Sequence, residues 1–380
     1  MNAMQAEVQA VIDGLVDSGA ERGLQVAVYR HGDQVVDAVA GVADRSTGRP
    51  VTSDTPFYAT STAKGVAATV VHVLAERGLL GYDTRIAELW PEFAAHGKKA
   101  ATVRDALTHS VGVPGLPVDT QPEAFLDWDA MCALIAGAKP WWTPGTRTGY
   151  HAQTFSWIVG EIVRRATGRR ISQVLRDEVS GPLGIADELF FGVPTSELGR
   201  LARLEDQEYP ADAIPPGDEE APAFGAPPDE HDGWVWAPPA TMPDATFGNR
   251  ADLLATDIPA GGTMTARAVA RMYAALMHDV QGVRLVSNER LRQITAVAVS
   301  GIDEVLGFPA ARGLGYDVGG LGGPLDSPTL FGMAGSGGTA AYADTASGIA
   351  IAVMKNVNTF GDFTTFNLVA EAAAKHAADR

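Results

Sequence analysis

Hydrophobic residues recur at three- and four-residue spacing between Val66 and Leu80. This spacing predicts a helix with one face in the core. The segment 60–65, Thr-Ser-Thr-Ala-Lys-Gly, runs directly into it, so Ser61 should lie in the first turn. Because positions i and i+3 of a helix share a face, the side chains of Ser61 and Lys64 should point the same way.

The same periodicity predicts other helices, and alternation predicts strands. An amphipathic helix is expected within residues 1–19. Further helices are expected at Ile86–Leu89, Val103–Leu107, Ala124–Ala136, Thr154–Thr167, Arg267–Met277 and Phe363–Ala378. The strand-like runs are Leu24–Arg30, Gln34–Ala40, Thr339–Ala343 and Ile349–Lys355, and the turn His31-Gly32-Asp33 joins the first two into a hairpin.

Two early strands cannot make a stable sheet, and the best candidates to join them lie about 300 residues later. We therefore expect an α/β (α+β) fold, an antiparallel sheet flanked by helices and built from both chain ends, residues 1–60 and 285–380. A mostly helical lobe, residues 61–284, would be inserted between them. Its acidic, proline-rich part 205–232 is predicted to be a long loop. Ser61 would lie at the border between the lobes, a common place for an active site.

Composition favours a globular protein that acts on a small molecule. The chain has 380 residues, 46% of them hydrophobic, and a net charge of -17, which would repel nucleic acid and anionic lipid. A single cysteine, Cys132, excludes an internal disulfide. Cys132 lies in a predicted helix, and we expect its side chain in the protein core. No run approaches the roughly 20 apolar residues of a membrane span. The N-terminus does not resemble a secretory signal, so a cytoplasmic location without membrane binding is expected.

Ser61 and Lys64 are candidates for nucleophilic catalysis. An amine beside a hydroxyl can take its proton, provided that burial or a neighbouring cation lowers the pKa of the amine. None of the other five lysines has a serine three residues before it. The alternative is that Ser61 is a helix-terminal hydroxyl and Lys64 a solvated surface residue.

Several motifs follow one another in the order of a known superfamily. They are Ser61-Thr62-Ala63-Lys64, Leu107–Pro114 (LTHSVGVP), Pro144-Gly145-Thr146 before Gly149-Tyr150-His151-Ala152, Pro259–Leu276, and Phe331–Gly338 (FGMAGSGG). Over roughly residues 20–360 the chain resembles the serine β-lactamase and penicillin-binding-protein superfamily, in particular its class C-like esterases.

The resemblance implies roles for individual residues. Ser61 would be the acyl-forming nucleophile and Lys64 its base or proton relay, while Tyr150 would help to move a proton to the leaving group. The backbone N–H groups of Ser61 and Ser336 would form the oxyanion hole.

Two positions depart from the family pattern. Ala152 stands where the second motif has asparagine, and Met333 stands where the third motif, here Met333-Ala334-Gly335, has lysine or histidine. In the family those groups contact the polar amide and carboxylate of lactam or peptide substrates. Their loss points to an uncharged or hydrophobic ester.

Five residues are candidates for contacts with the substrate: Ala152, Met333, Gly335, Trp141 and His151. Trp141 is either a core residue or a cleft wall for an apolar acyl group. His151, like His109, is either structural or catalytic, and residues of this type more often have the structural role.

No metal or cofactor is expected. His231-Asp232 lacks further ligands at metal spacing, and alternation rather than a helix follows the glycines after Gly335, unlike a dinucleotide-binding fingerprint. The chain also lacks the Gly-x-Ser-x-Gly elbow of α/β-hydrolases.

The sequence thus favours a serine hydrolase that cleaves a small, apolar carboxylic ester through an acyl-Ser61 intermediate. An acyltransferase that passes the acyl group to an alcohol or amine would use the same residues. A catalytically inactive ligand-binding protein is a third possibility. The sequence leaves the oligomeric state open.

Overall fold

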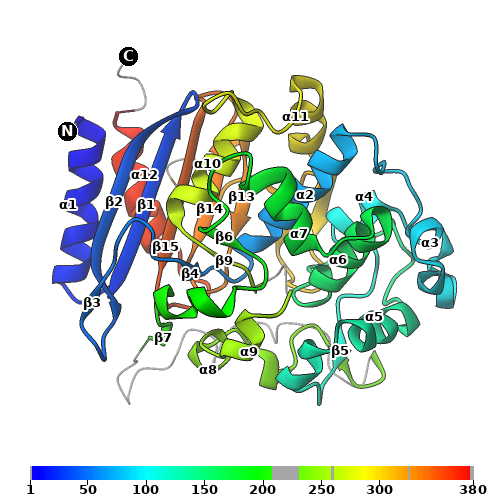
Figure 1. Cartoon of the computed structure of the whole chain (residues 1–380). Helices are drawn as coiled ribbons and strands as arrows, with labels where there is room; N and C mark the ends of the chain where they lie inside the picture. The colour runs from blue at the N-terminus through cyan, green and yellow to red at the C-terminus, as the bar shows by residue number, and fades with distance from the viewer. Residues whose placement is uncertain (1, 208–230, 258–260, 324–325, 377–380) are drawn as a thin grey trace.

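The computed structural model describes residues 2–207, 231–257, 261–323 and 326–376. Its centre is a nine-stranded sheet in the order β10-β11-β12-β13-β14-β15-β1-β2-β3, built from both ends of the chain (Figure 1). The strands are β1 Gly23–Arg30, β2 Asp33–Asp44, β3 Arg49–Pro50, β10 Val299–Ile302, β11 Pro309–Arg312, β12 Asp317–Gly319, β13 Ser327–Ala334, β14 Ala340–Asp344 and β15 Ile349–Lys355.

The first and last segments of the chain pair as predicted. β1 is antiparallel to β15, with Leu24 opposite Lys355 and Arg30 opposite Ile349. The turn between β1 and β2 has φ of 51° at His31 and 94° at Gly32, which suits the twist of a tight hairpin. The predicted antiparallel sheet is therefore confirmed.

Helices cover both faces of this sheet (Figure 1). On one face lie α1 Ala3–Asp17 and α12 Thr364–Ala374, and on the other lie α10 Ala266–Met277 and α2 Thr62–Glu76. The side chains of β1 point alternately to the two faces of the sheet. Val26 and Val28 pack with α1 and α12, whereas Ala27 and Tyr29 belong to the larger core on the other face. A strand covered on both sides is apolar at consecutive positions, as residues Val26–Tyr29 of β1 are.

The middle of the chain is mostly helical. Its helices are α3 Ile86–Leu89, α4 Val103–Leu107, α5 Trp128–Gly137, α6 Thr154–Thr167, α7 Ile171–Leu175, α8 Ala245–Gly248 and α9 Ala251–Leu254, followed along the chain by α10 and α11 Asn288–Thr295. Cys132 is buried in α5, as predicted. None of the helices within the described ranges is long and apolar enough to cross a membrane.

Most predicted helices have the expected bounds, with two differences. The predicted helix 124–136 is divided, because a 3-10 turn spans Pro122–Leu126 and the Asp127 side chain then caps a new helix by accepting a hydrogen bond from the N–H of Ala130. The helix predicted to reach Leu80 ends at Glu76, because Gly78 adopts the left-handed conformation at φ 70°.

Five strands of the large sheet were not predicted: β3 and β10 to β13. The structure also has short paired strands, β4 Phe57–Tyr58 with β9 Thr263–Met264 and β6 Leu189–Phe190, β5 Leu116–Pro117 with β8 Trp234–Val235, and β7 Glu205–Asp206 with β16 Val357–Asn358. Most of these strands have two to four residues, which leaves little room for a two-residue period to stand out. β13 is longer, but its residues Leu330–Met333 are buried in a run and do not alternate.

The division into lobes at residues 61 and 285 stays a prediction. α10 falls within the predicted helical part and yet packs on β1 and β15. Of the predicted loop 205–232, residues 208–230 lie outside the described residues, and so do the last residues of the predicted helix 363–378.

A buried ion pair joins the N-terminal and C-terminal parts of the chain. Lys355 at the end of β15 bonds Glu21, and each side chain is only 2% exposed. Lys355 Nζ also donates to Thr359 at 2.9 Å, and Thr365 donates to Glu21 at 2.6 Å. The pair therefore ties α1 and β1 to the C-terminal segment.

We predict that Lys355→Met lowers the free energy of unfolding by about 3 kcal/mol, because it leaves the Glu21 carboxylate buried without its cation. Denaturant unfolding followed by circular dichroism measures the change. Lys375→Met is the matched control, since Lys375 pairs with Glu7 at the exposed surface and its loss should hardly move the midpoint. Equal midpoints for the two variants would contradict the prediction.

Candidate active site

Ser61 is held at the start of α2 by contacts with the opposite end of the chain. The preceding Thr60 has φ 43°, a conformation that few residues other than glycine adopt. The hydroxyl of Thr62 lies 2.9 Å from that of Thr339, which donates to the carbonyl of Ala59 at 2.9 Å. The beginning of α2 is thus fixed to the turn between β13 and β14, which carries Ser336.

Lys64 lies directly beside Ser61, as the helical spacing predicts. Its Nζ is 2.8 Å from the Ser61 Oγ, and the lysine is completely buried. Burial lowers the pKa of Lys64 to about 7, and the nearby Asp317 carboxylate opposes this shift. Near neutral pH a substantial fraction of the amine is therefore uncharged and able to accept the serine proton.

Tyr150 completes a group of three side chains around the serine hydroxyl. Lys64 Nζ lies 4.9 Å from the centre of the Tyr150 ring. Burial raises the pKa of Tyr150 strongly, while a hydrogen bond with Ser61 opposes the rise to a smaller extent. Tyr150 is therefore a neutral phenol rather than a phenolate. It is suited to donate a hydrogen bond to an oxygen that gains negative charge.

The edge of the large sheet holds Tyr150 in place. The Tyr150 N–H donates to Asp303 Oδ1 at 3.0 Å. Arg312 in β11 donates to Asp303 Oδ2 at 2.6 Å and to the hydroxyl of Thr148 at 2.8 Å. This buried network was not predicted, because Asp303 and Arg312 lie in short, irregular segments far from Tyr150 in sequence.

His151 braces this loop and does not face the substrate cavity, which corrects its assignment as a substrate contact. Its Nε2 accepts from the N–H of Val113 at 3.1 Å, and its Nδ1 bonds the carbonyl of Gly149 at 2.7 Å. Burial lowers the pKa of His151 to about 4, so the ring is neutral. The neighbouring His109 accepts from the N–H of His151 at 3.0 Å and is likewise buried. Both histidines are structural.

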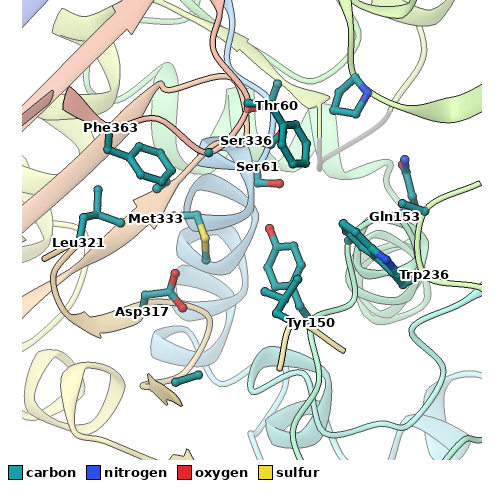
Figure 2. A pocket seen from close by; sticks show the side chains of 18 of the residues that line it. Thr60, Ser61, Tyr150, Gln153, Trp236, Asp317, Leu321, Met333, Ser336 and Phe363 are labelled. Carbon is teal, nitrogen blue, oxygen red and sulfur yellow. The ribbon is translucent and has the colours of Figure 1, made fainter. Parts of the chain in front are cut away.

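A cavity of about 380 Å³ opens above Ser61. Tyr150, Met333 and Ser336 line it together with Ser61, as predicted (Figure 2). Ala152 also lines it, as predicted. Most of the remaining wall is apolar, and it includes Trp236, Phe247, Leu306, Phe308, Phe360 and Phe363. The volume suits a small organic molecule.

Two predicted wall residues lie elsewhere. Trp141 is not among the described residues that line the cavity, and its ring stacks on His231 with the centroids 3.8 Å apart. Gly335 also lies behind the wall, where its N–H donates to Thr339 at 2.8 Å. A Cβ at Gly335 would come within 2.1 Å of the Thr60 hydroxyl. Glycine is therefore needed for the close approach of two backbone segments.

The backbone at Ser61 and Ser336 is suited to bind an oxyanion. Neither N–H donates to any group within the described part of the chain. Ser61 directly precedes α2, whose N-terminal end favours negative charge. The Ser336 carbonyl accepts from Gly361 at 2.8 Å, which helps to fix the turn. Their role as oxyanion hole stays a prediction.

Asp317 is a charged wall residue that sequence reasoning missed. It lies in β12 and points into the cavity close to Met333 and Tyr150 (Figure 2). Arg312 Nε is 3.6 Å from Asp317 Oδ1. Because β12 is only three residues long, its sequence gives little sign that it is a strand. Among the described residues, no group of three His, Cys, Asp or Glu side chains is placed to hold a metal ion.

Comparison with known proteins agrees with this geometry. The β-lactamase family model matches residues 8–374. The esterase/β-lactamase LipL of Mycobacterium tuberculosis is 34% identical over 340 residues, which cover 88% of this chain and 77% of LipL. The crystal structure of a family VIII carboxylesterase has a TM-score of 0.85 at 32% identity, with 98% of each chain covered. A penicillin-binding protein homologue from Caulobacter crescentus has a TM-score of 0.83 at 33% identity, with 99% of this chain and 98% of that chain covered. The chain therefore belongs to the β-lactamase family, in agreement with the order of its motifs.

Proposed function

We propose that this protein hydrolyses small, apolar carboxylic esters through an acyl-Ser61 intermediate. The observation that carries the proposal is the contact of 2.8 Å between Ser61 Oγ and Nζ of the fully buried Lys64. The protein is a serine hydrolase, since similar proteins of the family are esterases or carboxylesterases.

In acylation, the Ser61 oxygen attacks the carbonyl carbon of the ester, and its proton moves to Lys64 Nζ. The carbonyl oxygen takes up the negative charge near the N–H groups of Ser61 and Ser336. When the C–O bond breaks, the Tyr150 phenol passes a proton to the departing alcohol and is reprotonated from Lys64. Water then attacks the acyl-enzyme and gives its proton to Lys64. The carboxylic acid leaves as Ser61 regains its hydrogen.

The cavity wall supports an apolar ester as substrate. Ala152 and Met333 offer no hydrogen bond where an amide or carboxylate would need one, and burying such a group unpaired costs about 1 to 3 kcal/mol. That cost corresponds to roughly a ten- to hundred-fold handicap for each missing contact. An apolar ester has no such group to desolvate.

We predict that Ser61→Ala and Lys64→Ala each lower kcat by about a thousand-fold or more, because the two groups act as a unit. Hydrolysis of nitrophenyl esters of short acids measures the loss. Lys99→Ala, which removes an exposed lysine, is the matched control and should keep full activity. Wild-type protein should also gain the mass of a fluorophosphonate at Ser61. Normal turnover by a folded Ser61→Ala protein would refute the nucleophile assignment, and an unlabelled, inactive wild type would indicate a binding protein.

We also predict that kcat/KM rises with pH and levels off above about pH 7. The free enzyme is active when Lys64 is uncharged, and burial places the pKa of Lys64 at about 7. Below this pH the ammonium form predominates and cannot accept the serine proton. A pH profile with a neutral ester measures the midpoint. A flat profile between pH 5 and 9 would contradict a lysine base with this pKa.

The third prediction for the site is that the protein prefers simple esters to a chromogenic cephalosporin. In the variant Ala152→Asn with Met333→His, kcat/KM for the cephalosporin should improve relative to a short-chain ester, even if both rates fall because the wall is repacked. Steady-state kinetics of both proteins on both substrates decide the matter. If the wild type cleaves the cephalosporin as fast as the ester, the two wall residues do not set the preference.

A further inference from the structure

Asp317 is a carboxylate exposed to an otherwise mostly apolar cavity. β12 pairs with β13 so that Asp317 lies opposite Gly332, the residue before Met333. Its side chain is 35% exposed and faces the cavity beside Met333 (Figure 2). A carboxylate in this position reaches the space that a substrate bound at Ser61 would fill.

The Asp317 carboxylate has unused hydrogen-bonding capacity. Within the described ranges no donor forms a hydrogen bond with its side-chain oxygens. The nearest cation, Arg312, approaches with its Nε at 3.6 Å, which is too long for a good hydrogen bond. The other nitrogens of Arg312 donate to Asp303 and to Thr148. Both oxygens of Asp317 are therefore available to a donor in the cavity.

The charges around the cavity leave an excess of one negative charge. Arg312 is paired with Asp303, whose side chain is completely enclosed. Asp317 remains, and Lys64 balances it only when Lys64 is protonated. Burial raises the pKa of the Asp317 carboxyl, and the nearby Arg312 opposes this shift, so a cation bound beside Asp317 would favour its charged form. The mechanism requires neutral Lys64, and in that state the charge of Asp317 is uncompensated.

We propose that Asp317 selects esters that carry a protonated amine, because its carboxylate accepts a hydrogen bond from the N–H of that amine. Asp317 disfavours esters that carry a carboxylate. The proposal rests on the proposed ester hydrolysis and modifies its substrate class: the preferred ester is apolar except for one ammonium group that contacts Asp317. A bound cation near Asp317 would also keep Lys64 in its uncharged form, because like charges repel. A second carboxylate would be repelled by Asp317 and would find only apolar wall around it.

Two matched pairs of esters test the proposal at neutral pH. On the alcohol side, dimethylaminoethyl acetate is compared with isoamyl acetate, its uncharged isostere. On the acyl side, the methyl ester of 4-(dimethylamino)butyric acid is compared with methyl 5-methylhexanoate, its uncharged isostere. The monomethyl ester of glutaric acid supplies the anionic substrate, and acid release is followed by titration.

We expect kcat/KM to favour the protonated amine over its isostere by about tenfold in at least one pair. Relative to the neutral methyl ester of the acyl pair, the anionic ester should be disfavoured by a similar factor. Asp317→Asn should lower the preference for the protonated amine to one or below, because the ammonium then lies against an apolar wall, and it should weaken the discrimination against the anionic ester. Glu304→Gln is the matched control, because it removes the same charge from a side chain that pairs with Arg147 and does not line the cavity. It should keep the wild-type ratios.

Ratios near one in both pairs for the wild type, with the neutral esters hydrolysed, would overturn the inference and leave the proposed ester hydrolysis intact. Ratios that Asp317→Asn and Glu304→Gln change equally would also overturn it. If no neutral ester is hydrolysed, the proposed function itself fails. Should Asp317→Asn not fold, the wild-type ratios and the variant Asp317→Ser decide instead.

Discussion

The burial of Lys64 beside Ser61 is the constraint on which the site depends. A lysine in water holds its proton too firmly to act as a base near neutral pH. At this position burial lowers its pKa to about 7, while Asp317 acts in the opposite direction. Desolvation thus outweighs an attractive charge. The lysine is a useful base only as long as its surroundings exclude water.

Excluding water from Lys64 requires contributions from distant parts of the sequence. All residues of α2 from Thr62 to Ala75 are buried. The helix is therefore enclosed on all sides, and the prediction from its periodicity that only one face lies in the core is wrong. α2 packs between α6 of the helical region and β13 of the sheet. The contacts of Thr339 with Thr62 and Ala59 join the helix start to the sheet. The base therefore exists only in the folded chain, because no local segment could bury it.

Local patterns in the sequence predicted much of this arrangement. The period of hydrophobic residues gave α2, α4 and α6 within a few residues, and the i and i+3 spacing placed Lys64 beside Ser61. The pairing of β1 with β15 followed from the need of two strands for further partners. The motif order gave the family, and with it the places of Tyr150, Ala152 and Met333 on the cavity wall.

The parts that sequence reasoning missed depend on long-range contacts. β10 to β12 are three or four residues long, so their period is too short to detect, and with them Asp303, Arg312 and Asp317 remained unnoticed. His151 was named as a candidate substrate contact, and a structural role was weighed against a catalytic one. Neighbouring residues of an extended segment point in opposite directions, so Tyr150 can face the cavity while His151 does not. The side chain of His151 accordingly turns inward to Val113. Trp141 was named as either a core residue or a cleft wall, because the sequence alone does not fix the direction of its side chain.

The unpredicted edge of the sheet has two opposing effects on the chemistry. Arg312 lies 6.0 Å from the centre of the Tyr150 ring and, through Asp303, fixes the backbone of that residue. The same strands bring in Asp317, whose charge favours the protonated, inactive form of Lys64. A carboxylate that acts against the base while its oxygens face the cavity is better explained by a contact with the substrate than by catalysis itself. One short stretch of sheet at the edge of the cavity thus has both roles. β11 carries Arg312, which helps to position Tyr150, and β12 carries Asp317, which we propose selects the charge of the substrate.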